Sequence, residues 1–338
     1  MPVAVIVTYN SARDLPALLA GLAEAELPAV VVDNDSGDDT VAVAREAGAR
    51  VVETGANLGY AGALNVAWRH ISAQDAVLVL NPDSTVDGES VNALVRAADE
   101  GVGVAVPVLR EADGALARSR RFEPSRRRAL VDALLGRRAA WLPSGWSETE
   151  WAESAYRPGA ADPEWTCGAA LLITARCREL VGDWDERFWL YSEEVDFFRR
   201  VRATGLRTVF VPEATVVHRG GGSGAGPALT ALLAVNRVRY FAKYHGRGAV
   251  AVFRSLVVLH ELLRFRDAGH RAALKAVRRR CLASQARGLR AQAAPGGTAA
   301  SAEYGQYEAE PAAPPGTTWI TKPIEQTHQT APGRECAG

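Results

Sequence analysis

Cysteine is scarce in this 338-residue sequence, which contains four. Cys167, Cys177, Cys281 and Cys336 stand far apart with no C-x-x-C spacing, which excludes a disulfide scaffold and favours a reducing compartment. Long apolar runs are also missing: no stretch reaches 18 apolar residues, so no ordinary transmembrane helix is predicted. The N-terminus lacks the basic segment of a signal peptide, and we therefore expect a cytoplasmic protein.

Glycine-rich phosphate loops are absent where common nucleotide-binding enzymes carry them. A dinucleotide-binding dehydrogenase places G-x-G-x-x-G after its first strand, whereas this chain has Thr8-Tyr9-Asn10-Ser11-Ala12-Arg13 there. A Walker A loop is missing too, and so is the basic, glycine-rich loop expected of a nucleotidyltransferase. No nucleic-acid-binding motif occurs, and no nucleic-acid partner is predicted.

The composition itself is that of a globular protein, with 48% hydrophobic and 23% charged residues. Its net charge of zero hides an asymmetry. Between Arg237 and Arg290 stand 14 basic and two acidic residues, which leaves 25 basic and 37 acidic residues elsewhere. A basic segment with interleaved apolar residues predicts an anionic partner, such as a membrane surface or a lipid diphosphate.

The first hundred residues alternate β-branched runs with helical patterns. This alternation predicts an α/β fold with a mostly parallel sheet buried on both faces. The predicted strands are Val3–Val7, Val30–Val32, Val51–Val52, Ala76–Leu80 and Val102–Val106, and the predicted helices are Leu15–Leu22, Thr40–Ala47, Ala61–His70 and Ser90–Ala98.

The later chain is less regular. An arginine-rich surface excursion is predicted through Pro163, and Gly220–Gly226 predicts a flexible loop. Regular structure is predicted at Trp165–Thr174, Glu193–Ala203, Thr208–Val211, Leu229–Tyr244, Ala249–Arg264 and Arg271–Leu289. We expect a catalytic domain over residues 1–227, with a donor half of about 1–110 and an acceptor half of about 111–227. A basic helical region over 228–292 and a disordered tail over 293–338 follow.

Polar residues terminate three of the predicted strands. They are Thr8-Tyr9-Asn10, Asp33-Asn34 and Asn81-Pro82-Asp83. Ligands of parallel α/β sheets bind at the carboxyl ends of the strands, so these residues predict a binding site at one sheet edge. Taken singly, each group is equally typical of a plain turn.

Six motifs in order resemble glycosyltransferase family 2, most closely its bacterial rhamnosyltransferase-like branch. They are Val7-Thr8-Tyr9-Asn10, Val32-Asp33-Asn34, the run from Asn57 to Asn65, Leu80-Asn81-Pro82-Asp83-Ser84, the run from Asp185 to Asp196, and Val217-His218-Arg219-Gly220-Gly221. The resemblance covers about Val3 to Tyr244 and implies the GT-A fold, followed here by basic amphipathic helices. It further implies an inverting transferase that uses a nucleotide diphosphate sugar.

The resemblance also implies a donor site and a metal. The donor-site residues are Thr8, Tyr9, Asn10, Asp33, Asn34, Asn57, Gly59, Asn65, Asn81 and Asp83. Many relatives carry D-x-D where this chain has Asn81-Pro82-Asp83, which leaves Asp83 as the one carboxylate ligand for Mg²⁺ or Mn²⁺, with His218 completing the site. A lone histidine is otherwise more often structural.

Three acids open the helix predicted at Glu193. An inverting transfer needs a base, and the resemblance assigns Glu194 to that role with Asp196 in reserve. Acids in a first helical turn also simply complement the helix dipole, and Ser192 fits an N-cap. On the acceptor side we expect Trp165, Gly168, Trp189 and Glu193.

In the helix Ala249–Arg264, an apolar stripe of Val252, Leu256, Leu259 and Leu263 has cationic flanks. Such a stripe fits a helix lying in a membrane interface, and it equally fits one packed on the catalytic domain. The predicted function is transfer of a hexose or deoxyhexose, first rhamnose from dTDP-rhamnose and next galactofuranose from UDP-galactofuranose, to a glycan or polyprenyl-diphosphate-linked acceptor. It would act at the inner face of the cell membrane. A non-catalytic scaffold is the competing class, and a homodimer is left open.

Overall fold

The computed structural model describes residues 2–220 and 226–278. Every one of these residues belongs to the same compact unit. The predicted tail, the middle of the glycine loop and the end of the last predicted helix lie outside the described residues.

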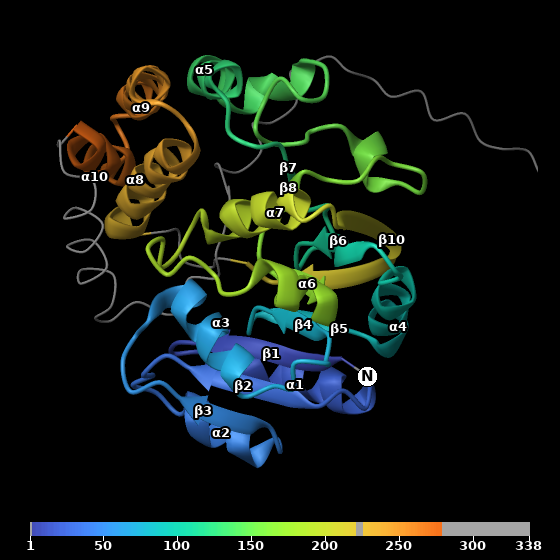
Figure 1. The fold of residues 1–338 in the computed structure, drawn as a ribbon. Helices are drawn as coiled ribbons and strands as arrows, with labels where there is room; N and C mark the ends of the chain where they lie inside the picture. Colours follow the sequence, from blue (N-terminus) through green and yellow to red (C-terminus); the bar gives the residue numbers. More distant parts are fainter. Residues whose placement is uncertain (1, 221–225, 279–338) are drawn as a thin grey trace, which may run out of the picture. The chain divides into compact units, whose positions relative to one another are not determined.

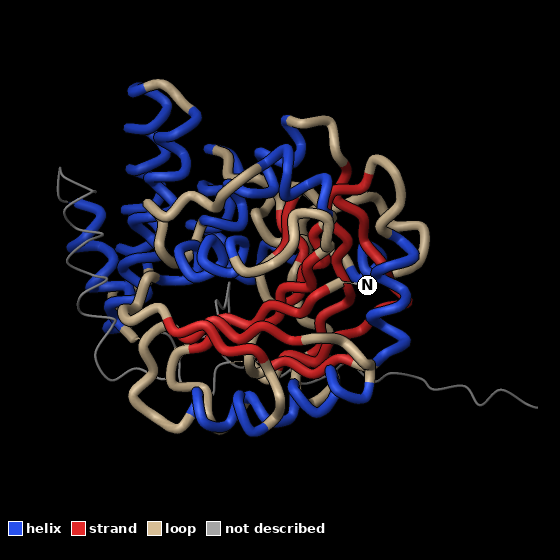
Figure 2. Tube along the Cα trace, turned by 60° about the horizontal axis from the view of Figure 1, so that its bottom comes forward, coloured by secondary structure: helices blue, strands red, loops and turns tan. Residues whose placement is uncertain are grey.

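An eight-stranded, mostly parallel sheet forms the centre of the unit, with helices on both of its faces (Figures 1 and 2). In spatial order the strands are β3 (Arg50–Glu53), β2 (Ala29–Asp33), β1 (Val3–Thr8), β4 (Val77–Leu80), β9 (Ala170–Ile173), β6 (Val102–Arg110), β10 (Arg207–His218) and β5 (Ser84–Val86). Strands β9 and β5 run antiparallel to their neighbours, whereas the other six are parallel. The carboxyl ends of those six strands therefore share one edge.

Alternating side chains along the strands fill two cores. Val5 and Val7 of β1 pack with α3 (Gly59–Arg69), α6 (Ala175–Val181) and α7 (Glu193–Ala203). The side chains between them, Ala4 and Ile6, pack on the other face with α1 (Leu15–Glu24), α2 (Thr40–Glu46) and α4 (Gly88–Ala97). This two-sided burial is what the continuous β-branched runs predict.

Two strands are longer than predicted. β6 continues past Val106 to Arg110, and β10 continues past Val211 to His218. The two pair in parallel on both sides of an irregularity between Val211 and Thr215. This irregularity interrupts the apolar run that the sequence offers, yet the strand resumes after it and carries His218 to the edge.

The excursion before Pro163 contains regular structure that the sequence did not predict. It holds β7 (Arg120–Arg121), α5 (Arg126–Leu135) and two 3₁₀ turns, η1 (Gly136–Trp141) and η2 (Glu153–Tyr156); β7 pairs with β8 (Trp165–Thr166). The only fully buried side chains of α5 are those of Ala129 and Ala133, so its apolar period is faint.

The last described helices are α8 (Pro227–Tyr244), α9 (Arg247–Leu263) and α10 (Ala268–Arg278). They form a third core that also includes Ala129 of α5 and the side chains of Trp189 and Tyr191. Within the described ranges, no helix combines the length and the hydropathy that crossing a bilayer requires.

Candidate active site

Thr8 and Asp33 meet at the carboxyl edge of the sheet, where β1 and β2 end side by side. The Thr8 hydroxyl donates to Asp33 Oδ1 at 2.9 Å, and the Ser36 backbone N–H donates to Asp33 Oδ2 at 2.9 Å. The Ser36 hydroxyl also donates to Asp33 Oδ1, at 2.6 Å. These bonds fix the buried carboxylate with its orientation set before any ligand arrives.

Tyr9 and Asn10 continue this edge just beyond β1. Asn10 adopts a left-handed backbone conformation with φ +54°, and its side-chain oxygen accepts from the Gly37 N–H at 2.7 Å. Its own N–H donates to the Ser36 hydroxyl at 2.8 Å. Tyr9 and Asn10 are half-buried, so they retain surface that a ligand can contact.

Asn34 joins the end of β2 to the start of α3. Its amide donates to the Gly59 carbonyl at 3.1 Å, while its oxygen accepts from the Leu58 N–H at 3.3 Å. Asn57 in turn accepts from the Gly59 N–H at 3.0 Å, and its carbonyl accepts from the Trp189 indole at 3.2 Å. The predicted donor residues Asn34, Asn57 and Gly59 therefore form one network, with Trp189 packed over it.

Gly59 is required by this packing. Its φ is +74°, and a Cβ here would lie 2.3 Å from Cδ1 of Trp189 and 2.5 Å from the Trp189 carbonyl oxygen. We expect Gly59→Ala to lower the free energy of unfolding by about 2–4 kcal/mol, because left-handed strain adds to a clash with backbone. Thermal melting measures this. Gly55→Ala is the control, since Gly55 has φ +70° with nothing within 4 Å of its Cβ. Equal melting temperatures for the two variants would contradict the expectation.

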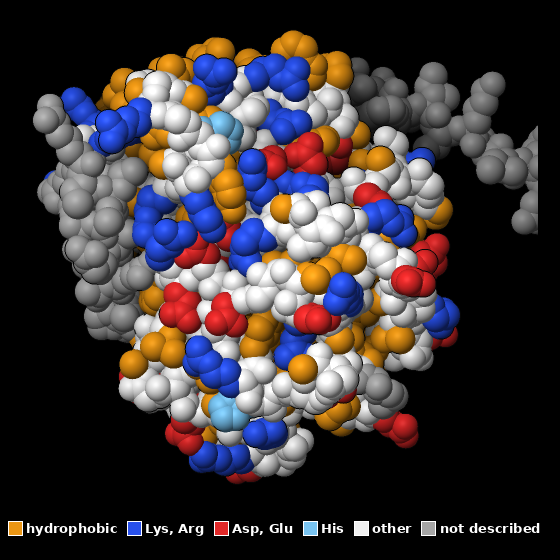
Figure 3. Space-filling view, viewed as in Figure 1, with side chains coloured by type: hydrophobic (Ala, Val, Ile, Leu, Met, Phe, Trp, Pro, Cys, Tyr) orange, Lys and Arg blue, Asp and Glu red, His pale blue; other side chains and the backbone are white. Residues whose placement is uncertain are grey.

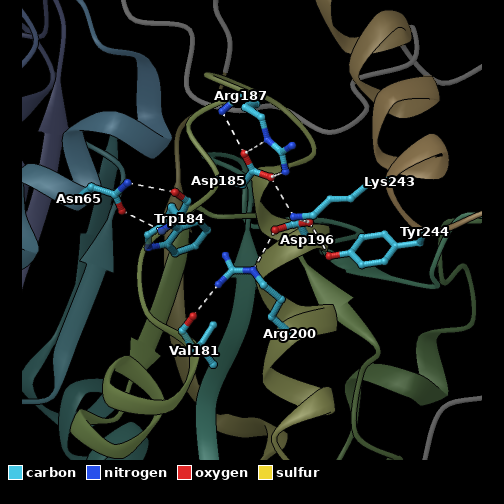
Figure 4. Close-up of polar contacts among 9 residues, drawn as sticks. All are labelled: Asn65, Val181, Trp184, Asp185, Arg187, Asp196, Arg200, Lys243 and Tyr244. Carbon is cyan, nitrogen blue, oxygen red and sulfur yellow. Dashed lines mark hydrogen bonds and ion pairs between the residues drawn. The ribbon is translucent and has the colours of Figure 1, made fainter.

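Asn65 is used to hold a loop. Its amide donates to the Trp184 carbonyl at 3.0 Å, and its oxygen accepts from the Trp184 N–H at 2.8 Å (Figure 4). The amide also donates to Glu186 at 2.9 Å. These contacts tie α3 to the segment that leads into α7. A direct contact of Asn65 with the donor stays a prediction.

Asn81, Asp83 and His218 come together although 137 residues separate the first from the last. Nε2 of His218 lies 3.1 Å from Asp83 Oδ1 and 3.2 Å from the Asn81 amide nitrogen. β5 and β10 pair so that Ser84 faces His218, which places Asp83 beside the ring. The two residues predicted as metal ligands therefore lie against each other at the shared edge.

This arrangement fits a divalent cation. A carboxylate oxygen and an imidazole nitrogen are both ligands that a divalent cation accepts. Neighbouring ligands of an octahedral ion at about 2.1 Å lie about 3.0 Å apart, and Asp83 Oδ1 and His218 Nε2 lie 3.1 Å apart. Asp83 and His218 would supply two ligands, and phosphate oxygens and water would supply the rest.

Glu111 is a further acid at this edge that sequence reasoning missed. It follows β6 directly, and burial raises its pKa above the usual value, although the nearby His218 offsets part of that rise. The sequence pattern that indicates such a residue is present, because a polar residue comes at the end of a strand here, as at Asp33 and Asp83. It was hidden because the predicted strand ended at Val106, four residues before the observed end at Arg110.

Glu194 occupies the first turn of α7 and is fully buried. Its Oε1 accepts from the Gly168 N–H at 3.3 Å, and Oε2 has no hydrogen-bond partner among the described residues. Burial raises the pKa of Glu194 to about 7, which suits a proton acceptor near neutral pH. Gly168 lets the carboxylate approach, since a Cβ there would lie 3.1 Å from Oε1.

The Tyr60 hydroxyl also reaches this position, although the sequence analysis did not single it out. It donates to the Gly168 carbonyl at 2.8 Å, and burial together with Glu194 and Glu193 raises its pKa well above the ordinary value. Tyr60 thus braces the peptide that contacts Glu194. It lies within the family-like run from Asn57 to Asn65, and only its place in that run indicates a functional role from the sequence.

Asp196, the reserve base, is held by cations. Its carboxylate accepts from Arg200 at 3.0 Å and from the Tyr244 hydroxyl at 2.7 Å, and Lys243 bridges it to Asp185 (Figure 4). Burial would raise the pKa of Asp185, but hydrogen bonds from Arg187 and Lys243 outweigh it and hold that pKa below its usual range. The cluster links α7 to α8.

The loop before α7 has an unusual backbone. Trp189, Tyr191 and Ser192 all have φ near +70°, a conformation that is strained for residues other than glycine. Asn236 of α8 holds the loop by donating to the carbonyls of Phe188 and Leu190 at 2.7 and 2.8 Å. Ser192 occupies the predicted N-cap position of α7, but in this conformation its side chain makes no capping hydrogen bond to the helix start.

The other predicted acceptor-side residues are buried. Trp165 is 1% exposed, and its indole donates to the Phe122 carbonyl at 3.0 Å within the core that α7 covers. Glu193 is buried beside Glu194. Contact of Trp165, Gly168, Trp189 and Glu193 with an acceptor stays a prediction.

A second titratable cluster lies between α9 and α10. Ligand atoms of His260, Glu261 and His270 lie within 4.8 Å of one another, and His270 pairs with Glu261 at 2.7 Å. Burial, together with Arg237 and Arg264, lowers the pKa of His260 to about 2. The same positive field opposes a metal cation, and the contact between His270 and Glu261 joins α9 to α10.

Comparisons with known proteins agree on a family and a fold. The profile of glycosyl transferase family 2 matches residues 3–143. An N-acetylglucosaminyl-diphospho-decaprenol L-rhamnosyltransferase of Mycobacterium tuberculosis is 34% identical over 242 residues, covering 66% of this chain and 78% of its own length.

Two solved structures resemble the fold. A mannosyltransferase of Pyrobaculum calidifontis, in complex with GDP-Man and Mn²⁺, gives a TM-score of 0.50 at 20% identity, covering 88% of this chain and 75% of that one. GalNAc-T7 with UDP, GalNAc and Mn²⁺ gives 0.54 at 14% identity, covering 82% of this chain and 55% of that one. At these identities the likeness shows the fold alone, and it confirms the expected GT-A architecture.

Proposed function

Because this chain belongs to glycosyl transferase family 2 and is a glycosyltransferase, we propose that it transfers a hexose or deoxyhexose from a nucleotide diphosphate sugar to a polyprenyl-diphosphate-linked acceptor in cell-envelope polysaccharide synthesis. The matched mycobacterial relative, named for a decaprenol-linked acceptor and L-rhamnose, supports this substrate class. On the same ground dTDP-rhamnose is the first donor candidate, with UDP-galactofuranose next.

One observation carries the proposal: Asp83 and His218, the proposed metal ligands, and Glu194, the proposed base, are positioned by neighbouring strand ends. The Asn81 N–H donates to the Ala169 carbonyl at 3.0 Å, and the adjacent Gly168 N–H donates to Glu194. Asp83 and His218 follow β4 and end β10, while Gly168 and Ala169 lead into β9 between those strands. A base and a diphosphate-binding pair on one edge fit sugar transfer from a nucleotide diphosphate.

In the proposed reaction Glu194 takes the proton of the acceptor hydroxyl as its oxygen attacks the anomeric carbon. The bond from that carbon to the diphosphate breaks, the nucleoside diphosphate leaves with the bonding pair, and the anomeric configuration inverts. Mg²⁺ or Mn²⁺, when bound, neutralises the leaving diphosphate. Asp83 and His218 would hold that ion, and Thr8, Asp33 and Asn34 would bind the base and ribose.

Glu194 is preferred over Asp196 because of its surroundings. Lys243, Arg200 and Tyr244 all contact the Asp196 carboxylate, so both of its oxygens are already engaged. One oxygen of Glu194 accepts no hydrogen bond among the described residues, and its pKa lies near 7. A non-catalytic scaffold would not need a buried carboxylate that has one unbonded oxygen and a pKa near 7.

A donor panel tests the proposal. Folded protein is mixed with dTDP-rhamnose, UDP-galactofuranose and other nucleotide hexoses, with Mn²⁺ and a polyprenyl-diphosphate-linked sugar. We expect one donor to be consumed and also to stabilise the protein, by about 2.7 kcal/mol at a hundredfold excess over its Kd. Failure of every donor to bind folded protein would contradict the transferase and favour the scaffold.

The substrate class also suggests where the protein works. A polyprenyl-linked acceptor lies in a membrane, so we propose peripheral contact between the C-terminal basic helices and the inner face of the cell membrane. The catalytic domain over residues 1–227 and the basic region over 228–292 remain proposed boundaries. A homodimer remains an open alternative.

A further inference from the structure

Exposed apolar side chains gather on two helices that pack together. Eight of the twelve large hydrophobic residues exposed in the described part of the chain lie between Leu130 and Trp141 or between Val252 and Phe265. The first stretch is α5 with η1, and the second is most of α9 with the residues after it. Figure 1 places α5 beside α9, and Figure 3 shows apolar atoms along this side with Lys and Arg atoms among them.

Arg264 joins the two helix ends into one surface. Its guanidinium donates to the carbonyls of Asp132 and Ala133, both at 3.0 Å. The exposed residues next to Ala133 therefore lie beside those flanking Arg264. We call this set the apolar rim; it consists of Leu134, Leu135, Trp141, Leu262, Leu263 and Phe265. Trp141 is 83% exposed, so folding leaves nearly all of this large side chain uncovered.

Positive charge dominates around the apolar rim. Residues 126–141 and 247–267 contain nine arginines and three acids, Asp132, Glu261 and Asp267. Glu261 is buried, Asp132 is half-buried and Asp267 is exposed, and Arg126, Arg127, Arg138 and Arg266 are exposed as well. Apolar side chains surrounded by exposed arginines match a bilayer of anionic lipid, where rings and alkyl chains enter the interface and cations meet headgroups.

We propose that the apolar rim and its arginines dock this protein on an anionic lipid bilayer. This deepens the membrane contact proposed above and gives it a surface that the sequence did not indicate, because α5 and η1 lie in the predicted excursion. A second copy of the chain is a poorer occupant, since a two-fold contact would bring like-charged arginines together. Lipid binding is measured without donor or acceptor, so its failure is distinguishable from failure of transfer.

The test is co-flotation of the full chain with phosphatidylcholine vesicles, with and without phosphatidylglycerol. We expect binding that needs phosphatidylglycerol and falls as salt rises from about 0.1 M to about 1 M. Arg138→Ala with Arg266→Ala should weaken binding roughly thirtyfold, since each cation near an anionic surface contributes about fivefold in affinity. Leu134→Ser with Trp141→Ala should weaken it about tenfold or more.

The matched controls lie on α6. Leu180 and Arg176 are also exposed, and Leu180→Ser with Arg176→Ala should bind vesicles as the wild type does. All variants change exposed side chains, and thermal melting verifies that they fold. No vesicle binding by the wild type, or equal losses in control and rim variants, would overturn the proposal. So would rim variants that dissociate a dimer but still bind vesicles normally.

Discussion

Glu194→Gln is expected to reduce sugar transfer by about 10²–10⁴-fold, the range that a positioned general base contributes. The substitution keeps the size and hydrogen-bonding shape of the neutral side chain, so donor binding should survive. In the wild type the rate should fall about tenfold per pH unit below the Glu194 pKa of about 7 and level off above it. The variant should lose this pH dependence. Transfer assays across pH, with donor affinity measured separately, check both.

The same substitution should stabilise the protein in alkaline solution. The pKa of Glu194 is raised from 4.5 to about 7, so between these values the folded chain binds a proton that the unfolded chain does not. Stability contributed by this group therefore falls as pH rises through that window and stays low above it. Gln avoids the loss and should add up to about 3 kcal/mol above pH 7 and nothing below about pH 4. Denaturant unfolding at both pH values measures it.

Asp196→Asn is the matched control, and it should destabilise the protein rather than stabilise it. It removes the charge that Lys243 and Arg200 face, and because those side chains keep some contact with water we expect a loss of about 2–3 kcal/mol. Activity should then follow the folded fraction. A large loss of transfer in fully folded Asp196→Asn, with Glu194→Gln active, would reverse the assignment of the base.

The second large effect is expected at Asp83. Asp83→Asn keeps the side-chain shape but removes the carboxylate that lies against His218. We expect Mn²⁺ affinity in the presence of nucleoside diphosphate to fall by about tenfold to a hundredfold, and transfer by about 10²-fold or more. Paramagnetic resonance of free Mn²⁺ gives the affinity without any turnover.

Asp87→Asn provides the comparison, because Asp87 directly follows β5 whereas Asp83 directly precedes it. Asp87 caps α4 by accepting from the Ser90 N–H at 2.7 Å, and because Asn caps a helix about as well as Asp, stability should change little. Mn²⁺ affinity should not change. If both variants lost Mn²⁺ equally, or if Asp83→Asn bound it as the wild type does, the assignment of Asp83 as a ligand would fail.

Much of this architecture was predictable because local patterns carried it. Val3–Thr8 and Ala29–Asp33 are continuous β-branched runs that end in polar residues, and parallel pairing brings their ends together. Glu193–Ala203 was predicted with the bounds observed. The meeting of Asp83 with His218 was implied by family resemblance and depends on β10 reaching the edge, which its sequence pattern did not show.

The remainder depends on tertiary contacts that leave little trace in the sequence. The buried residues of α5 are the small Ala129 and Ala133, so its sequence shows little helical periodicity and predicts an irregular segment. Asn236 holds a strained loop 45 residues away, and Glu111 reaches the site only because β6 is four residues longer than predicted. The sequence around these residues has no distinctive pattern, and only the fold shows which groups they contact.

The central claim is that the sheet edge performs metal-assisted transfer to an acceptor. The most direct test measures nucleoside diphosphate release and glycosylated lipid together, using wild-type protein, the donor that binds, and a polyprenyl-diphosphate-linked sugar. The account predicts equal amounts of both products, lost when either the acceptor or the divalent metal is withheld. Release that is unchanged without acceptor, or transfer that is undiminished in excess chelator, would contradict it.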